Sequence, residues 1–511
     1  MASNSAIRSF AVKHADALVA AIAGSIMVHI FTKYAGVGIS PDSIMYMSTA
    51  RNLNHGLGYL YFGDKPIVAF PVFYPTFLAV AEFVTGTDPL RLGPYLDGLL
   101  FATLIFLSGV IMERFTFRSK IYKWVILLAI VLSPSLLEIY TYLWSETLFM
   151  VWVLVFIMVY HNYAQSHSTK ALIILSIVTA LAFLTRYAGV TLIGTGGLLL
   201  LFDHQLKLKD KIRHILTFGF ISISLLVVNL IRNAMVTHTG TGPRYWSVTS
   251  LSENMHYFGT VMCDWFTIGE KAYGVAFTIT LLLVLGFIIA FLLNTFRNRA
   301  MYNSYENIAL AFFIVYALFM IISASISRYE RLNNRLLSHL FIPFLWGCTY
   351  WIPGLIRKIA SIKYRVALTT IALGIGFCFI YGELYRGDKG DFQRYDDEND
   401  YGIPGYTDDG WNKSDFISAL KNQPQLFKPG FTVYNNACEA FYFFTNMGSE
   451  YIPHKNDPVA IKKFYASSRF FIVVFNQLPD PAELQMDEIL KHKNLQLIYH
   501  TPDGSIYECD R

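Results

Sequence analysis

The sequence predicts a polytopic α-helical membrane protein that ends in a small soluble α/β domain. Of its 511 residues, 54% are hydrophobic and only 15% are charged, whereas ordinary globular domains carry about 25% charged residues. Apolar runs of about twenty residues, the length that crosses a bilayer, recur almost to Tyr381. After them the chain becomes polar and strand-like. We therefore expect about eleven transmembrane helices, amphipathic helices at the membrane surface, and a C-terminal extracytoplasmic domain.

The expected spans differ in length. The first, from Ala17 to Phe31, is long and has no convincing A-x-A cleavage site, which favours a retained membrane helix over a signal peptide. The two runs around Arg186 are short, and a short membrane helix is tolerated where it is buried in protein or lines a cavity. The predicted spans are 17–35, 93–112, 122–139, 143–161, 170–184, 188–202, 214–232, 273–294, 306–326, 338–356 and 366–384.

Basic residues indicate how the chain is oriented. With eleven spans, four Lys/Arg clusters fall on one face together with the N-terminus, and the positive-inside rule makes that face cytoplasmic. The net charge of +5 is modest and no basic block occurs, so we expect no nucleic-acid partner. The clusters lie at 114–123, 207–213, 297–299 and 357–365. The outward parts are then the loops 37–92 and 233–272 and the tail.

These patterns predict two domains, a transmembrane module over 1–385 and a linker plus soluble domain over 386–511. The acidic, Gly-rich segment after Arg386 is expected to be an irregular linker. Strands are expected over 431–434 and 470–475, helices over 437–445 and 481–491, and a hairpin turning on Pro502-Asp503-Gly504. Cys438 and Cys509 could pair if the tail lies in an oxidising compartment.

The first outer loop carries an acid at the rim of the membrane. Asp42 follows Ser40-Pro41 and opens an amphipathic run in which Tyr46 and Ala50 recur at helical spacing. An acid in this setting is costly unless it is paired or used. The alternative is that Asp42 serves only as a helix cap.

A second acid, Glu146, stands where a span begins on the same predicted face. It could face the protein interior or simply interact with the helix dipole. If it shares an outward cavity with Asp42, the two carboxylates could divide general-base work and the positioning of a metal ion or donor.

Outward-facing arginines break the positive-inside rule. Arg328, Arg331 and Arg335 lie in one outer loop, and Arg186 separates two short apolar runs. Arginine binds phosphate with a planar, bidentate fork, and Arg331 and Arg335 are four residues apart, on one face if the segment is helical. We expect at least one of Arg186, Arg331 and Arg335 to bind phosphate, although Arg186 could instead snorkel to an interface. Lys65, Arg244 and His256 are weaker candidates in outer loops.

Several blocks, in order along most of the chain, resemble the C-type (GT-C) glycosyltransferase superfamily. More narrowly, they are similar to bacterial relatives of protein O-mannosyltransferases and of the lipid A aminoarabinose transferase. The first block is D-x-x-x-Y-x-x-x-A-x-N-L-x-x-G-x-G from Asp42 to Gly58, followed by P-x-x-Y-P ending at Pro75. The later blocks are S-E-x-L-F at 145–149, L-T-R-Y-A-G at 184–189, R-L-x-x-R-x-L at 331–337, and tail motifs at 435–445, 452–453 and 503–507.

The resemblance implies an inverting transfer of a sugar from a polyprenyl-phosphate donor to a lipid, glycan or protein acceptor, outside a bacterial inner membrane. Asp42 would be the general base, and Glu146 would share the catalytic site. The donor would be bound by Tyr46, Lys65, Tyr74, Arg186, Tyr187, Arg331 and Arg335. The only cofactor candidate is a divalent ion, Mg²⁺ or Mn²⁺, on Asp42 and Glu146. Many relatives have two adjacent acids where this chain has Asp42-Ser43, so metal dependence stays open. Many also have Pro where this chain has His339.

Two other function classes remain as alternatives. A transporter or flippase of lipid-linked sugars would also need outward arginines and a lipid groove, but transporters usually show internal repeats and broken helices at mid-membrane, and no long-period repeat is present. A non-catalytic scaffold that displays the tail domain leaves the charges at the membrane rim unexplained.

Overall fold

The computed structural model describes residues 13–62, 64–242, 246–266, 272–327, 330–385 and 390–510. It divides into two compact units. The helical unit comprises the chain up to residue 33 together with 68–74 and 92–399, and the sheet unit comprises 34–67, 75–91 and the chain from residue 400 onward. The first outer loop thus belongs largely with the tail, a grouping that the sequence did not reveal.

Helices occupy all eleven positions at which spans were predicted. In the part of the chain that the structure describes, seven helical segments are long and apolar enough to cross a membrane, or eight if one bent pair is counted as a single span. The seven are α5 (Pro89–Met112), α8 (Ser145–Ser166), α11 (Leu208–Thr237), α13 (Tyr273–Leu292) with its extension to Arg297, α14 (Tyr305–Ile326), the segment 334–358, and α18 (Ile362–Tyr385). The count of eleven stays a prediction.

The remaining apolar helices are bent or short. The bent pair is α6 (Lys120–Val131) and α7 (Pro134–Tyr140), which meet at 52° where Ser133-Pro134 interrupts the helix. The short ones are α2 (Ala15–Phe31), α4 (Phe73–Thr85), α9 (Thr169–Thr185) and α10 (Val190–Phe202). Apolar helices shorter than 18 residues thus recur along the described part of the chain.

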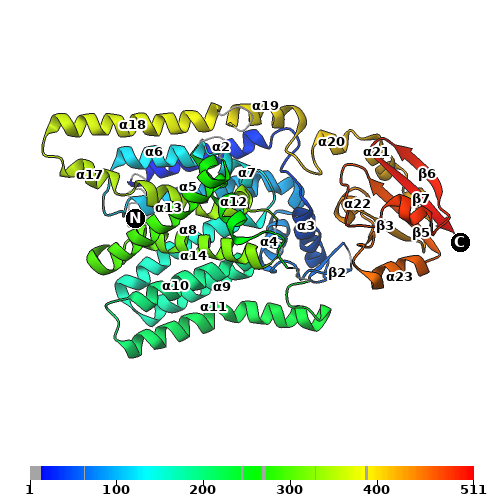
Figure 1. Ribbon diagram of the computed structural model, residues 1–511, viewed down its shortest axis with the longest axis horizontal. Helices are drawn as coiled ribbons and strands as arrows, with labels where there is room; N and C mark the ends of the chain where they lie inside the picture. The colour runs from blue at the N-terminus through cyan, green and yellow to red at the C-terminus, as the bar shows by residue number, and fades with distance from the viewer. Residues whose placement is uncertain are drawn as a thin grey trace. The chain divides into compact units, whose positions relative to one another are not determined.

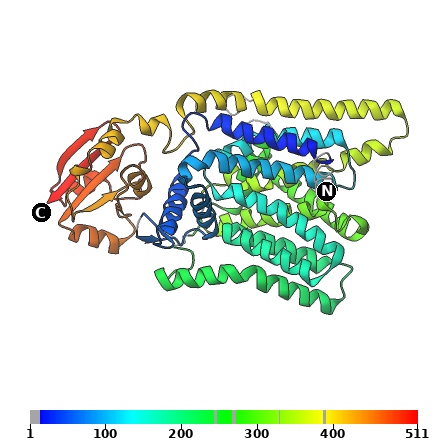
Figure 2. The same cartoon turned by 180° about the vertical axis from the view of Figure 1, so that it is seen from behind.

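Burial separates the core of the helical unit from its lipid-facing edge. The apolar windows of α8 and α14 are each 67% buried, whereas that of α18 is 6% buried. Figures 1 and 2 show α2, α6 and α18 side by side at one edge of this unit, with α9, α10 and α11 at the other. A helix that is apolar all round and packs on little protein is suited to contact with lipid.

The acidic segment after residue 389 is a helix, so the prediction of an irregular linker is wrong there. Helix α19 (Asp391–Tyr401) is held by Arg394, which pairs with Glu398 at 2.5 Å. The same guanidinium donates to the carbonyl oxygen of Pro134 at 3.0 Å and to Oγ1 of Thr141 at 2.8 Å. One arginine thus anchors a polar segment that composition alone makes look irregular. Residues 386–389 lie outside the described ranges.

The sheet unit contains a five-stranded mixed sheet in the order β4-β3-β5-β7-β6. Strands β4, β3 and β5 run parallel, and β7 and β6 continue the sheet antiparallel. The strands are β3 (Thr432–Asn435), β4 (Glu450–Tyr451), β5 (Arg469–Phe475), β6 (Gln496–Thr501) and β7 (Gly504–Asp510). Strands β3 and β5 and the terminal hairpin of β6 and β7 therefore lie where the sequence predicts them, whereas β4 was not predicted.

Both faces of the central strand β5 are covered. Its side chains alternate across the sheet: Ile472 packs in a cluster with Phe464 of α23 (Pro458–Ala466) and Ile489 of α24 (Met486–Leu490). On β5, Phe475 contacts Phe416 of α21 (Asp415–Asn422). The helix predicted over 481–491 forms only as α24, because the chain before it makes a turn.

The first outer loop packs within the sheet unit through α3 (Pro41–Asn54) and a short hairpin of β1 (Leu60–Tyr61) and β2 (Lys65–Pro66). The ring of Phe62 lies 4.9 Å from that of Tyr442, on α22 (Cys438–Thr445). Cys438 begins α22 and Cys509 lies on β7, and both are buried thiols. The disulfide that the sequence left open is not formed.

Candidate functional site

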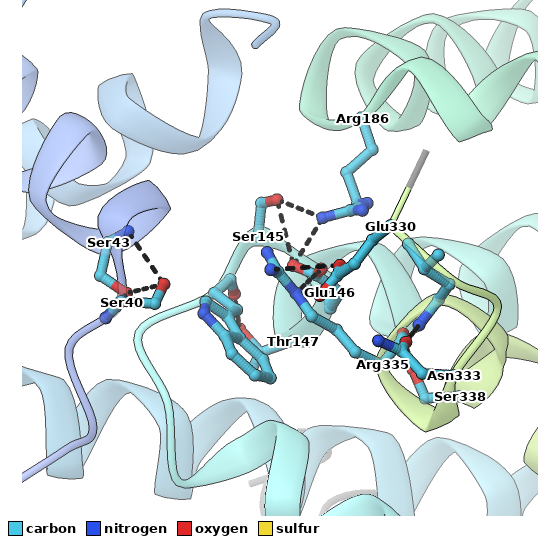
Figure 3. Close-up of polar contacts among 12 residues, drawn as sticks. Ser40, Ser43, Ser145, Glu146, Thr147, Arg186, Glu330, Asn333, Arg335 and Ser338 are labelled. Carbon is cyan, nitrogen blue, oxygen red and sulfur yellow. Dashed lines mark hydrogen bonds and ion pairs between the residues drawn. The ribbon is translucent and has the colours of Figure 1, made fainter. Parts of the chain in front are cut away.

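The centre of the candidate site is the carboxylate of Glu146, in the first turn of α8. Its side chain is fully buried, and each oxygen faces a guanidinium: Oε2 lies 2.5 Å from Nη1 of Arg186, and Oε1 lies 2.7 Å from Nε of Arg335 (Figure 3). Nη1 of Arg186 also donates to Oγ of Ser145 at 2.8 Å. The simpler explanation for Glu146 was an interaction with the helix dipole. Glu146 has in addition two ion pairs, and an electrostatic attraction is stronger in a buried setting than in water.

Arg186 is positioned by a break between two short helices. It ends α9 with an extended backbone (φ −146°, ψ 142°), and a single 3₁₀ turn then leads into α10. The break requires glycine at 189, because a Cβ there would lie 2.4 Å from the Cα of Phe183. The side chain of Arg186 is 17% exposed and points to Glu146, so it faces the interior of the helical unit and does not snorkel to a surface.

Arg335 is positioned by a short helix, α15 (Asn334–Leu337), which Asn333 caps by accepting from the backbone N–H of Leu336. Asn334 ties this helix to α7, donating to Oε2 of Glu138 at 2.6 Å. The guanidinium of Arg335 lies 4.2 Å from the ring centroid of Trp144, a cation–π contact that holds its plane.

Arg331 does not join this cluster. Because α15 begins only at Asn334, Arg331 precedes the helix, and the prediction that Arg331 and Arg335 share a helical face is wrong. Arg331 is exposed, and its guanidinium lies 4.0 Å above the ring of Tyr257. Of these two predicted outward arginines, Arg335 thus pairs with a buried acid and Arg331 lies on an aromatic ring. Arg328 and Arg244 lie outside the described residues.

The electrostatics of the cluster favour an anion. Two guanidinium groups face one carboxylate, which leaves a net positive charge, and the next acid, Glu330, lies 4.0 Å from Arg335 and is half exposed. Among the described residues, the buried Nε of Arg186 has no hydrogen-bond acceptor, and an unsatisfied buried donor is costly. A phosphate oxygen would satisfy both the charge and the donor.

The other predicted site residues of the helical unit have structural partners. The hydroxyl of Tyr187 donates to the carbonyl oxygen of Val68 at 3.1 Å, and Tyr74 is buried at the start of α4. His256 stacks on Tyr273, with ring centroids 4.5 Å apart.

The predicted site residues of the sheet unit are also placed. Tyr46 is a buried core residue of α3, and Nζ of Lys65 donates to the carbonyl oxygen of Ser449 at 2.6 Å, which joins β2 to the tail. Asp42 is half-buried in the first turn of α3, but the cap is Ser40, which forms a capping box with Ser43. The cap is thus Ser40, and Asp42 occupies the first turn, where the helix dipole favours an acid.

The fit of a metal ion to the two predicted acids is poor at Glu146. Both of its oxygens face guanidinium groups, and a cation would have to displace them. Ser43, where many relatives have a second acid, exchanges hydrogen bonds with Ser40. Asp42 and Glu146 belong to different units, so their shared cavity stays a prediction.

Sequence reasoning missed several residues that build the cluster: Trp144, Ser145, Asn333, Asn334 and His339. The adjacent asparagines just before Arg335 were a usable signal, because asparagine favours caps and turns. His339 was noted only as a departure from relatives. It is buried, with Nδ1 2.8 Å from the hydroxyl of Tyr316, and its Nε2 has no partner among the described residues.

Comparison with known proteins gives structural likeness alone. No family model matches the chain, and no curated protein matches it. Among solved structures, it is similar to ArnT from Cupriavidus metallidurans in the apo state, with a TM-score of 0.57 and 12% identity over 98% of both chains. The structure of that ArnT bound to undecaprenyl phosphate gives a TM-score of 0.56. The Archaeoglobus fulgidus oligosaccharyltransferase AglB, in complex with an inhibitory peptide and a dolichol-phosphate, gives 0.54 and 10% identity, over 98% of this chain and 74% of that one. ArnT and AglB are C-type glycosyltransferases, and this chain has their fold.

Proposed function

We propose that the protein is a membrane glycosyltransferase that moves a sugar from a polyprenyl-phosphate donor to an acceptor on the extracytoplasmic face. The observation that carries the proposal is the pair of arginines held by one buried carboxylate, with an arginine donor left without an acceptor. The fold adds support, because similar structures contain undecaprenyl phosphate and dolichol-phosphate.

In the proposed reaction the donor phosphate binds to Arg186 and Arg335, and Glu146 positions both guanidinium groups. The acceptor hydroxyl oxygen attacks the anomeric carbon while the bond from that carbon to the phosphate oxygen breaks. The lipid phosphate leaves with the electron pair, and the two arginines stabilise its charge. The hydroxyl proton passes to Asp42 as general base. A single displacement of this kind inverts the anomeric centre. No step is assigned to a metal ion, because Glu146 does not fit the role of ligand.

The acceptor, a lipid, a glycan or a protein, is expected to bind at the first outer loop and the tail. This assignment follows from their predicted outward position. Asp42 lies in the same unit as the tail domain, which suits a base that must reach the acceptor.

The first experiment uses purified full-length protein and a panel of radiolabelled polyprenyl-phosphate sugars, with and without a chelator. Wild type is compared with Asp42→Asn, and Asp64→Asn, an exposed acid in the same loop, is the matched control. We expect label to leave the lipid with wild type and Asp64→Asn, and the rate to fall by about 10²- to 10⁴-fold in Asp42→Asn.

Near-normal turnover in Asp42→Asn would remove the assigned base. If no donor is consumed but wild type moves the intact lipid across liposomes, the protein is a transporter. Loss of transfer in the chelator arm would show that a metal ion takes part.

A further inference from the structure

A second buried carboxylate lies in the sheet unit, far along the chain from the residues proposed for catalysis. Glu483 is 4% exposed, and it pairs across an isolated antiparallel bridge with His454. Two backbone hydrogen bonds flank that bridge, from Lys455 N–H to the carbonyl oxygen of Ala482 at 2.8 Å and from Leu484 N–H to that of Pro453 at 3.0 Å. The two side chains are therefore fixed opposite each other by the backbone.

Asp480 completes a cluster with them. One imidazole nitrogen of His454 and one carboxylate oxygen each of Asp480 and Glu483 all lie within 4.8 Å of one another. Oδ1 of Asp480 accepts from the backbone N–H of Ala482 at 2.8 Å, which fixes the turn that carries this carboxylate. The three side chains converge on one point from two segments of the chain.

Glu483 is almost fully buried as a residue, and its carboxylate forms no ion pair among the described residues. Among the described residues its carboxylate has no hydrogen bond and no ion pair, although buried charges in proteins are normally paired or bound to metal. The nearest cation along the bridge, Lys455, pairs instead with Glu488 at 3.2 Å. The site thus brings two carboxylates and an imidazole together, and no Lys or Arg is paired with Glu483 among the described residues.

We propose that His454, Asp480 and Glu483 bind a divalent transition-metal ion, Zn²⁺ or Mn²⁺, that fastens the turn before α24 to the segment after β4. A set of one imidazole and two carboxylates suits these ions, whereas Mg²⁺ and Ca²⁺ prefer oxygen ligands alone. Ligand atoms lie about 2.0–2.2 Å from Zn²⁺ and so roughly 3.4 Å apart in a tetrahedral site. Small side-chain movements would close the present spacing, and water would fill the remaining position.

The inference does not rest on the proposed function, so its test needs no sugar donor. Full-length protein, purified in detergent and stripped of metal by a chelator that is then removed, is titrated with ZnCl₂, MnCl₂ and MgCl₂ by calorimetry. We expect one Zn²⁺ or Mn²⁺ per chain, together with a higher unfolding temperature. Removing a group that only hydrogen-bonds to a metal ligand weakens metal binding by about 10- to 100-fold. Glu483→Gln and His454→Ala, which remove ligands, should therefore weaken it by at least about tenfold.

Matched controls are Asp487→Asn and His492→Ala, which are exposed on the same stretch of chain and should bind as wild type does. Each variant is first shown to unfold cooperatively, and Glu483→Gln is nearly isosteric, so a loss of binding would not reflect a loss of folding. Absence of binding by folded wild type, equal binding by the ligand variants, or a preference for Mg²⁺ would each overturn the proposal.

Discussion

Two buried glutamates, one in each unit, face opposite environments. Glu146 in the helical unit is fully buried and lies between two guanidinium groups at 2.5 and 2.7 Å. Glu483 in the sheet unit is 4% exposed and faces an imidazole and a second carboxylate, with no ion pair in the described part of the chain. Neither residue type nor burial distinguishes them. The sign of the neighbouring charge does.

The difference teaches what each carboxylate can do. A buried acid with two arginines is already satisfied, so it fixes those arginines and is a poor base or metal ligand. A buried acid beside another acid is unsatisfied, and it becomes stable by taking a proton or a cation. The same substitution, Glu to Gln, should therefore have opposite consequences at the two positions.

The largest expected effect is at Glu146. In Glu146→Gln the two arginines lose their shared counter-charge and separate, so we expect sugar transfer to fall by about 10²-fold, the scale of a misplaced catalytic group. Breaking a buried ion pair costs about 3–5 kcal/mol, so the free energy of unfolding should fall as well. Transfer rates and thermal unfolding measure the two effects.

Glu330→Gln is the control for Glu146→Gln, since Glu330 lies 4.0 Å from Arg335 but is half exposed, and it should change activity little. Glu146→Asp keeps the charge and should retain more activity than Glu146→Gln. Equal activity in Glu146→Gln and wild type would contradict the positioning role.

A smaller effect is expected at two arginines of the predicted phosphate site, the largely buried Arg186 and the exposed Arg331. Arg186→Lys keeps the charge but loses the planar guanidinium that contacts Glu146 and Ser145 together. We expect the KM for the donor to rise by about tenfold, which corresponds to the loss of about one charge-assisted hydrogen bond. Arg331→Lys keeps a cation over Tyr257 and should leave the KM nearly unchanged. If Arg331→Lys has the larger effect, the phosphate binds outside the Glu146 cluster.

The sequence predicted more of the secondary structure than of the site. Apolar runs and turn signals depend on local pattern, and they located helices at the eleven predicted spans and the strands β3, β5, β6 and β7, but not α12 (Leu251–Trp265) or β4. The C-type fold, expected from ordered blocks of residues, is confirmed by the structural likeness. Helix α19 was missed because one long-range anchor, Arg394, holds a segment whose composition is that of a linker.

The site was predicted only in part, because the sequence indicates which residues are unusual but not which long-range contacts they make. The predicted outward position of Arg186, Arg335 and Glu146 marked them as candidates, but their pairing depends on the break at Gly189 and on the cap at Asn333, which tertiary packing decides. Arg331 shows the limit, because spacing of four residues places two side chains together only if the segment is helical. Glu483 carried no sequence signal at all, since its burial comes from a bridge to a segment 29 residues away.

The smallest expected effect is that of Glu483→Gln on the unfolding temperature of the metal-free protein. Burial, Asp480 and Glu439 raise the pKa of Glu483 to about 7, above its value of about 4.3 in an unfolded chain. The folded state thus holds a proton that the unfolded state has released, and this contribution to stability is lost as the pH rises through about 7. Glu483→Gln carries no such charge. In the presence of chelator, we therefore expect the substitution to raise the unfolding temperature above that of wild type by a few degrees at pH 8, and by less at pH 5. Asp487→Asn, on the exposed side of α24, should follow wild type at both pH values. A lower unfolding temperature for Glu483→Gln at pH 8 would mean that Glu483, like Glu146, has a stabilising partner, and the contrast between the two glutamates would fail.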